Sequence, residues 1–344
     1  MPGHDIIVVG ASAGGVEALQ ELARGLPRDL PASVFVVLHI GSQPPEILPR
    51  ILSRKSAMPC RAATDGEPIE MGRCYLGVPG HHLTLTPGHI RLDHGPKENS
   101  VRPAVNALFR SAAAYYGPRV IGVVLSGLLD DGTAGLVAIK RRGGIAIAQD
   151  PRDALFPQMP QSAIDNVRVD HIIRVAQLGS LLAHLASTPA PDEIQFPLPQ
   201  DMDIEAKIGQ GVISMDKMPK LGTPSRLTCP DCGGTLWEMH EDDLMRFRCQ
   251  TGHAYSPETL AAKQSELVEG ALWAALRAMD ENIALARRVA QRARKHNRLP
   301  LAESFEEKAH RAERQADTLR AVLTKNAPES EMAQINVEEA TTAN

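Results

Sequence analysis

The sequence predicts an α/β fold built on a doubly wound, mostly parallel sheet. Short apolar runs rich in valine and isoleucine alternate with segments of helical spacing. This is the pattern of strands that are buried on both faces and joined by crossover helices. Polar residues follow several of these runs directly. Because ligand sites in such sheets lie beyond the carboxyl ends of the strands, these residues are the first candidates for a functional site.

Composition narrows the class of protein. The chain has 344 residues, of which 43% are hydrophobic and 3% aromatic, so it can build two domains with aliphatic cores. A net charge of -4 does not favour nucleic acid as a partner. The sequence has no apolar run of transmembrane length, and its five cysteines do not suggest a secreted disulfide framework. We expect a soluble, cytoplasmic protein without membrane insertion.

The first predicted strand and the turn after it place a serine at the sheet edge. Residues 6–9 are continuously apolar, residues 10–15 are rich in glycine, and helical spacing resumes at Val16. Three interpretations remain open. Residues 10–14 fit the G-x-S-x-G nucleophile elbow, with Ser12 as the serine. The turn could instead cradle a phosphate, although it lacks G-x-G-x-x-G, or Ser12 could cap the helix.

Two further strands end beside the residue types that a serine nucleophile needs. His39 follows the run 34–38, and Asp130 and Asp131 follow the run 120–125. A serine hydroxyl needs an imidazole to take its proton, and the imidazole needs a carboxylate to orient it. His39 could also be structural, and either aspartate could only cap the next helix. The rival bases are His81, His82, His89 and His94.

The remaining elements complete the first domain. The patterns predict a short helix at 48–52, short strands at 66–69 and 72–76, an antiparallel excursion at 82–92, a helix at 103–116, a helix from the third loop to about residue 142 and a strand at 145–148. Residues 169–173 and a helix at 177–186 close the domain. Residues 187–224 are rich in proline and are expected to be a linker.

Four spaced ligands predict a structural zinc site. Cys229-x-x-Cys232 and Cys249-x-x-x-His253 have the pairwise spacing of a zinc ribbon. A module this small has too little apolar core to fold without a bound metal ion. Because all four positions are used, a structural site is favoured over a catalytic one. A redox Cys-x-x-Cys pair and unconnected thiols are the alternatives, and His240 is a reserve ligand.

The last part of the chain predicts a helical hairpin. Apolar residues recur at steps of four and three on both sides of a break near 297–300, which indicates two antiparallel coiled-coil helices. Basic residues near the tip would form a solvated face or meet an acidic partner helix. The expected domains are 1–186 (α/β domain), 187–224 (linker), 225–257 (zinc ribbon), 258–326 (hairpin) and 327–344 (disordered tail).

Residues 4–186 resemble the catalytic domain of chemotaxis protein-glutamate methylesterases of the CheB type. The stretches that carry the resemblance are 8–18, 37–40, 75–82, 102–109 and 126–135. The resemblance implies Ser12 as nucleophile, His39 as base and Asp131 as orienting acid, with no catalytic cofactor. It also implies that the substrates are glutamate methyl esters on helical chemoreceptors, and that glutamines could be deamidated.

The sequence departs from the family pattern at three positions and at both ends. Ala13, Leu128 and Asn106 stand where the family usually has Thr, Met and Asp. The typical enzyme carries an N-terminal receiver domain, whereas here the first catalytic strand begins at Ile6, so we expect no control by a fused receiver. The ribbon and hairpin resemble the tail of stand-alone members of the family.

These observations favour a serine carboxylesterase that acts on a methylated, chemoreceptor-like helical protein. The backbone N–H groups near Ala13 and Gly14 are the expected oxyanion donors. The C-terminal hairpin would dock on a partner helix bundle or mediate self-association. A non-catalytic signalling adaptor with an esterase-like fold is the alternative, and a dinucleotide-dependent oxidoreductase is disfavoured by the glycine spacing.

Overall fold

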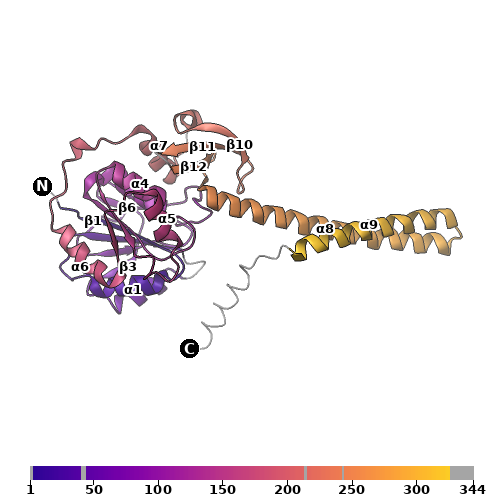
Figure 1. The fold of residues 1–344 in the computed structure, drawn as a ribbon, viewed down its shortest axis with the longest axis horizontal. Helices are drawn as coiled ribbons and strands as arrows, with labels where there is room; N and C mark the ends of the chain where they lie inside the picture. The colour runs from indigo at the N-terminus through magenta and orange to yellow at the C-terminus, as the bar shows by residue number, and fades with distance from the viewer. Residues whose placement is uncertain (1–2, 40–43, 213–214, 242–243, 326–344) are drawn as a thin grey trace. The chain divides into compact units, whose positions relative to one another are not determined.

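The computed structural model describes residues 3–39, 44–212, 215–241 and 244–325. The chain divides into two compact units between Ala261 and Ala262. The first unit holds a central sheet with helices on both faces and a second, smaller antiparallel sheet (Figure 1). The second unit is a pair of long helices.

Among the described residues, seven strands form the central sheet, and all their pairings are parallel. In sheet order they are β3 (Cys60–Ala62), β4 (Cys74–Leu76), β2 (Ser33–Leu38), β1 (Ile6–Ala11), β7 (Val120–Val124), β8 (Ile145–Gln149) and β9 (His171–Ile173). Strands β1, β2 and β7 are buried along their whole length, which explains their continuous apolar sequences. The predicted doubly wound parallel sheet is confirmed.

Helices cover both faces of this sheet. One face packs against α3 (Val105–Tyr116), α4 (Thr133–Arg141) and α5 (Gln158–Asn166), and the other against α1 (Gly15–Gly25), α2 (Ile47–Ser53) and α6 (Val175–Ala186). Val8 belongs to the first core, whereas Ile7 and Val9 belong to the second, as strand alternation requires. The chain order reverses at β1, so the carboxyl ends of β2, β1 and β7 form the switch point where ligands bind in such sheets.

Short elements account for most differences from the predicted pattern. The excursion at 82–92 is a two-stranded sheet of β5 (His82–Thr86) and β6 (His89–Asp93), as predicted. Strand β3 and helix α5 were not predicted. Residues 66–69, predicted as a strand, form only one bridge, between Pro68 and His89, so this prediction was wrong. The cause is local, because Gly66 has a φ of 75° and Pro68 has no N–H to donate.

The segment predicted as a linker contains a buried helix, α7 (Gln200–Gly209). Met202 packs into the core beneath α3, whereas Ile204 and Ile208 pack against Met239 of the small sheet. A helix that is buried on two sides has no single apolar stripe, so its sequence gave no helical signal. Three short 3₁₀ helices complete the connections: η1 (Gly117–Arg119), η2 (Glu193–Gln195) and η3 (Met215–Lys220).

The small sheet is antiparallel and lies within the first unit. Its strands, in order, are β10 (Thr223–Thr228), β11 (Thr235–Glu241), β12 (Leu244–Cys249) and β13 (Ala254–Tyr255). We call this module, with its connecting loops, the ribbon. Its own core is small and includes Leu236, Phe247 and Leu260, so packing alone provides little stabilisation.

The C-terminal helices pair along an apolar seam. Helix α8 (Pro257–Lys295) begins in the first unit, and α9 (Leu299–Lys325) runs back along it. The buried seam consists of Leu276, Ile283, Ala286, Ala309, Ala316 and Leu323. Ion pairs cross between the helices, from Arg287 to Glu313, from Arg294 to Glu306 and from Arg320 to Asp280. The predicted pair of helices is confirmed, whereas the predicted tail at 327–344 lies outside the described residues.

None of the described helices is both long enough and apolar enough to cross a membrane.

Candidate active site and metal centre

Ser12 lies in the turn between β1 and α1, at the carboxyl edge of the central sheet. The Ser12 N–H donates to the carbonyl oxygen of Ser126 at 2.9 Å, which anchors the turn to the neighbouring loop. Gly14 has a φ of 67° and is the N-cap of α1, and no side chain caps this helix. The alternative that Ser12 caps the first helix is therefore wrong.

His39 takes the equivalent position at the end of the next strand. Ala11 of β1 is paired with Leu38 of β2. Ser12 and His39 are the residues that follow this pair, so they lie at the ends of two neighbouring strands. The His39 N–H donates to the carbonyl oxygen of Ala11 at 3.2 Å. In the described part of the chain the Ser12 hydroxyl forms no hydrogen bond to His39, and such bonds often tighten only when substrate binds.

Asp131 is hydrogen-bonded to the His39 ring. Its Oδ2 lies 2.9 Å from His39 Nε2, and the carboxylate is almost completely buried. A carboxylate only accepts hydrogen bonds, so Nε2 carries the proton and Nδ1 is the nitrogen left to act as a base. The same carboxylate also accepts from the N–H groups of Val105, Asn106 and Gly132, at 2.7, 3.2 and 3.1 Å. Of the two candidate aspartates, Asp131 is the one that meets the imidazole.

The rival histidines have other partners. His82 is completely buried, its Nε2 lies 2.9 Å from the Pro96 carbonyl oxygen, and its Nδ1 accepts from the Ala104 N–H at 3.2 Å. Burial lowers the pKa of His82, which favours the neutral ring that these contacts require. The rings of His81 and His89 each contact a nearby proline carbonyl oxygen. Among the described histidines, only His39 is hydrogen-bonded to Asp131.

Asn106 belongs to the site in a way that the sequence did not reveal. Its Oδ1 accepts from the N–H groups of Gly132 and Gly135 at 3.0 and 2.7 Å, at the start of α4. Asp131, from the loop before α4, in turn accepts from the first N–H groups of α3. Asn106, near the start of α3, therefore caps α4, and Asp131, just before α4, caps α3. Neutral Asn106 does this without placing a second negative charge beside Asp131.

The turn that carries Ser12 also offers unpaired backbone donors. Within the described residues, the N–H groups of Ala13 and Gly14 form no hydrogen bond. The turn is held in place by Ser126, whose hydroxyl donates to the Ala13 carbonyl oxygen at 2.8 Å. Gly127 packs closely behind it, since a Cβ at this position would lie 2.8 Å from Ser12 Cβ and 2.0 Å from Met159 Sδ. Rigid, unpaired N–H groups beside a hydroxyl are what an oxyanion needs.

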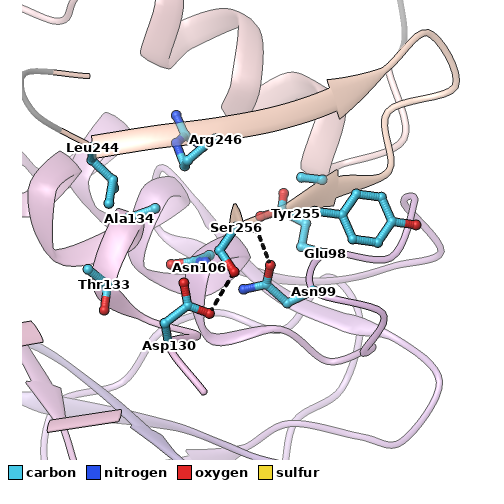
Figure 2. A pocket seen from close by; sticks show the side chains of 11 residues that line it. Glu98, Asn99, Asn106, Asp130, Thr133, Ala134, Leu244, Arg246, Tyr255 and Ser256 are labelled. Carbon is cyan, nitrogen blue, oxygen red and sulfur yellow. Dashed lines mark hydrogen bonds between the residues drawn. The ribbon is translucent and has the colours of Figure 1, made fainter. Parts of the chain in front are cut away.

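Asp130 contacts the start of α8, whereas Asp131 contacts His39. The Oδ1 of Asp130 accepts from the hydroxyl of Ser256 at 2.9 Å (Figure 2). Thr259 Oγ1 lies 3.4 Å from the same oxygen. Burial raises the pKa of Asp130 to about 6; the hydrogen bond from Ser256 opposes this shift, and the charge of Asp131 adds to it. The surrounding side chains enclose a cavity of about 20 Å³, room for a single water.

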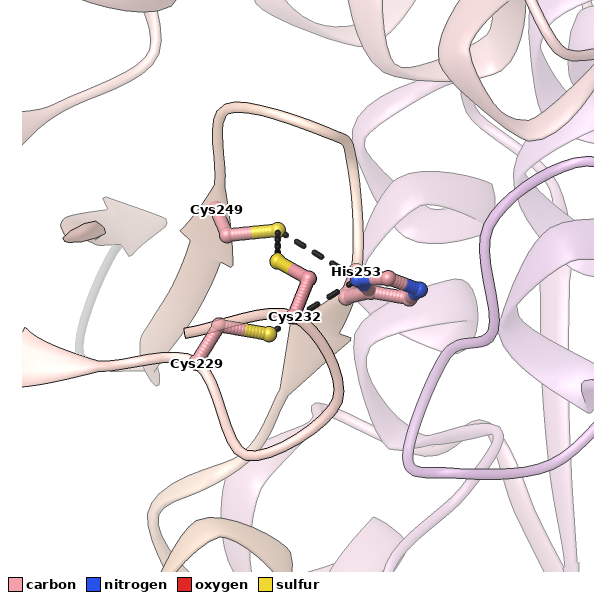
Figure 3. Close-up of side chains that lie close together, drawn as sticks. All are labelled: Cys229, Cys232, Cys249 and His253. Atoms are coloured by element: carbon pink, nitrogen blue, oxygen red, sulfur yellow. Dashed lines mark hydrogen bonds between the residues drawn. The ribbon is translucent and has the colours of Figure 1, made fainter. Parts of the chain in front are cut away.

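The predicted metal ligands lie together in the ribbon. Ligand atoms of Cys229, Cys232, Cys249 and His253 are all within 4.8 Å of one another (Figure 3). Cys232 Sγ is 3.7 Å from Cys249 Sγ, and His253 Nδ1 is 3.5 Å from Cys249 Sγ and 3.7 Å from Cys229 Sγ. Tetrahedral zinc bound by sulfur and nitrogen separates its ligand atoms by about 3.6–3.8 Å. The reserve ligand, His240, pairs with Glu238 instead and lies outside this cluster.

Comparisons with known proteins place the similarity in the first half of the chain. Residues 7–182 match the family described as CheB methylesterase. The crystal structure of the Thermotoga maritima CheB methylesterase catalytic domain superimposes with a TM-score of 0.52 at 32% sequence identity. The match covers 54% of this chain and 100% of that domain.

Two curated relatives match a similar share of this chain. Protein-glutamate methylesterase/protein-glutamine glutaminase 2 of Anaeromyxobacter dehalogenans is 38% identical over 181 residues, and the match covers 53% of each chain. Protein-glutamate methylesterase/protein-glutamine glutaminase 1 of Xanthomonas euvesicatoria is 36% identical over 186 residues, 53% of this chain and 52% of the relative. The chain therefore spans about half the length of these relatives. The ribbon and hairpin lie outside residues 7–182, which match the family.

Proposed function

Because the chain belongs to the CheB methylesterase family, we propose that it is a serine hydrolase that removes methyl groups from glutamate side chains of proteins. Ser12 is the nucleophile, His39 the general base and Asp131 the acid that orients it. The observation that carries the proposal is the hydrogen bond from His39 Nε2 to Asp131, at the strand end beside Ser12. An adaptor that only binds partners has no need of this arrangement.

The proposed reaction proceeds in two halves. His39 Nδ1 takes the Ser12 proton as Oγ attacks the ester carbonyl, and it then gives that proton to the departing methoxide, which leaves as methanol. In the second half, His39 Nδ1 takes a proton from water as the water oxygen attacks the acyl-enzyme. It then gives that proton to the departing Ser12 Oγ, which restores the serine and leaves a free carboxylate on the glutamate side chain of the substrate protein. Asp131 keeps the ring oriented and stabilises the imidazolium. The N–H groups of Ala13 and Gly14 hold the oxyanion in both halves.

The proposed substrate class follows from the relatives. Both relatives described above are named protein-glutamate methylesterase/protein-glutamine glutaminase, and a glutamine amide passes through the same tetrahedral geometry as a glutamate methyl ester. We therefore propose a methylated, chemoreceptor-like helical protein as substrate, with deamidation as a second activity. The proposed catalytic chemistry needs no cofactor.

The direct test is methanol release from a methylated cytoplasmic receptor fragment by the full chain. One methanol should appear for each glutamate methyl group lost, and an unmethylated fragment should release none. A serine-reactive phosphonate should in parallel label Ser12. Labelling without methanol release would mean that the substrate class is wrong. The absence of both would leave the adaptor as the better assignment.

We further propose that the ribbon holds a structural zinc ion through its three cysteines and His253. The distances between the ligand atoms support this site, because they match those around tetrahedral zinc. Zinc bound there supplies folding free energy to a module whose apolar core is small. The proposed zinc ion is structural and does not contact the proposed nucleophile, base or acid.

Elemental analysis of the full chain should find one zinc ion per molecule. Cys232→Ser removes one ligand and should lower the zinc content and the melting temperature of the ribbon. Cys60→Ser is the matched control, since Cys60 lies in β3 and outside the cluster. A folded wild-type protein that contains no metal, or an equal zinc content in both variants, would contradict the zinc site.

A further inference from the structure

The ribbon contacts the loop that carries the catalytic acid. Asp130 directly precedes Asp131; the residue is 8% exposed, and its carboxylate contacts the start of α8. Ser256 donates its hydroxyl to Asp130 at 2.9 Å. Two adjacent aspartates of one loop are therefore held by different elements, Asp131 by His39 and α3, and Asp130 by the C-terminal end of the ribbon.

Ser256 is itself held in a fixed position. Its Oγ accepts from the Thr259 N–H at 3.1 Å, so it caps the first turn of α8, which begins at Pro257. Its N–H donates to Asn99 Oδ1 at 3.0 Å, and the Asn99 N–H donates to the Ala254 carbonyl oxygen at 2.8 Å. Because Ser256 follows the metal ligand His253 by three residues, a metal in the ribbon would fix the same short segment.

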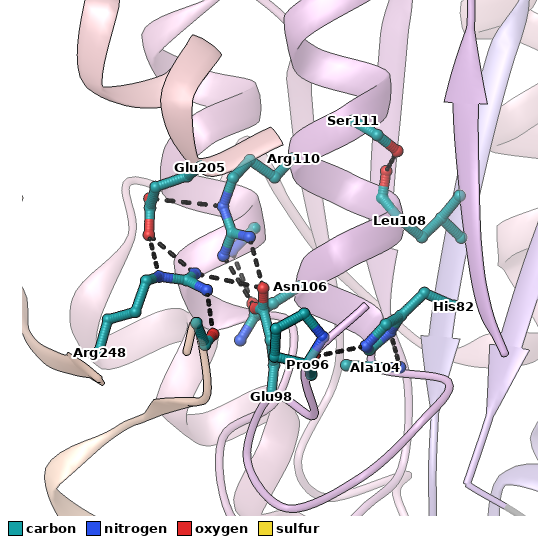
Figure 4. A network of polar contacts seen from close by, with 12 residues as sticks. His82, Pro96, Glu98, Ala104, Asn106, Leu108, Arg110, Ser111, Glu205 and Arg248 are labelled. Atoms are coloured by element: carbon teal, nitrogen blue, oxygen red, sulfur yellow. Dashed lines mark hydrogen bonds and ion pairs between the residues drawn. The ribbon is translucent and has the colours of Figure 1, made fainter. Parts of the chain in front are cut away.

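A buried cluster of ion pairs joins the ribbon to α3. Glu98 accepts from Arg110 of α3 at 2.8 and 3.0 Å and from Arg248 of β12 at 3.2 Å. Arg248 also donates to Glu205 of α7, at 2.9 and 3.1 Å (Figure 4). We call these four residues the ion cluster. Each is at most 2% exposed, so the ribbon, α7 and α3 share one interior.

The ion cluster makes this attachment stiff. Burial alone would raise the pKa of Glu98, but the guanidinium groups of Arg110 and Arg248 outweigh burial and hold that pKa below its usual range. Glu98 therefore stays ionised and paired. Moving the ribbon relative to α3 would break the charge-assisted hydrogen bonds of Arg248 to Glu98 and Glu205 at the same time. The position of Ser256 relative to α3 is thus set by contacts that do not easily break.

We propose that the ribbon is a working part of the active site, in which Ser256 is a positioning residue that acts through Asp130. By anchoring Asp130, it holds the loop after β7 so that Asp131 meets His39 at hydrogen-bonding distance. This inference rests on the proposed roles of Ser12, His39 and Asp131. It assigns to the ribbon a function in catalysis rather than in partner binding alone.

The test is to remove the Ser256 hydroxyl from the full chain. Ser256→Ala should lower kcat about tenfold or more, because a hydrogen bond to a charged group is lost, and should leave KM within about twofold. Ser256→Thr keeps the hydroxyl and should restore kcat. Ser256→Gly retains most of the helix-capping free energy but not the bond to Asp130, so it should resemble Ser256→Ala.

A matched control separates this effect from general damage to the ribbon. Ser225→Ala removes a hydroxyl that donates to the Leu236 carbonyl oxygen at 2.9 Å, within the ribbon and without contact to Asp130. It should leave kcat unchanged. Removing metal from the wild type with a chelator should lower kcat as much as Ser256→Ala does. Treating the Ser256→Ala variant with chelator should lower its kcat little further, because the substitution and metal removal both act on the same segment.

A second readout keeps this inference distinct from the proposed function. The rate at which a serine-reactive phosphonate labels Ser12 reports nucleophile activation without reference to the natural substrate. If Ser256→Ala labels at the wild-type rate and releases methanol normally, the positioning role is refuted while the esterase stands. If the phosphonate labels Ser12 of the wild type but no methanol is released, the proposed substrate is wrong. The labelling rates of wild type and Ser256→Ala then still test the positioning role. If wild type does not label, both proposals fall.

Discussion

Ser12→Ala should reduce methanol release from a methylated receptor fragment by about 10⁴- to 10⁶-fold. The substitution removes the attacking oxygen and leaves His39 and Asp131 with no nucleophile to activate. The Ser12 side chain caps no helix, so the loss should come without a change in melting temperature. Initial rates of methanol release and thermal unfolding, measured on the same preparation, check both parts.

The matched control is Ser180→Ala. Ser180 is exposed on α6, where its hydroxyl donates to the Gln177 carbonyl oxygen within the same helix. This variant should release methanol at the wild-type rate. If Ser12→Ala were equally active, the G-x-S-x-G turn would not be a nucleophile elbow, and the esterase mechanism would have to be abandoned.

Asp131→Asn should lower kcat by about 10⁴-fold. An amide can donate to His39 Nε2, which would leave the proton on Nδ1, the nitrogen that has to accept from Ser12. The substitution also replaces one of the two oxygens that accept from Val105 and Asn106, so α3 should lose some stability. Rates are therefore best compared well below the melting temperature of the variant.

Asp130→Asn is the paired comparison, because it makes the same change one residue away. Its Oδ1 can still accept from Ser256, and no contact with His39 is lost. We expect it to lose far less activity than Asp131→Asn. If the order were reversed, Asp130 would be the orienting acid and the arrangement around His39 would need a different explanation.

The sheet and its edge could be predicted because they depend on local patterns. Burial on two faces forces continuous apolar runs in β1, β2 and β7, and parallel strands bring their carboxyl ends to one edge. Ser12 and His39 follow directly from this placement. The choice between Asp130 and Asp131 did not, because both follow the same strand and only tertiary contacts show which one meets His39.

Other features depended on long-range contacts that no local pattern records. Helix α7 is buried between the ribbon and α3, so its apolar residues do not form one stripe and its segment was predicted to be a linker. Asn106 caps a helix that begins 27 residues later, and neither position signals the other in the sequence. That Cys229, Cys232, Cys249 and His253 lie together could be predicted, because their spacing in the sequence is characteristic.

The ion cluster has a practical consequence for shortened forms of this protein. A fragment that stops at Ala186 would keep Arg110 and Glu98 but lose Arg248 and Glu205, and the remaining pair would face water, where it contributes about 0–1 kcal/mol. The apolar surface under Met202 would be uncovered at the same time, which favours aggregation. Fragments intended for enzymology should therefore extend at least through Thr259.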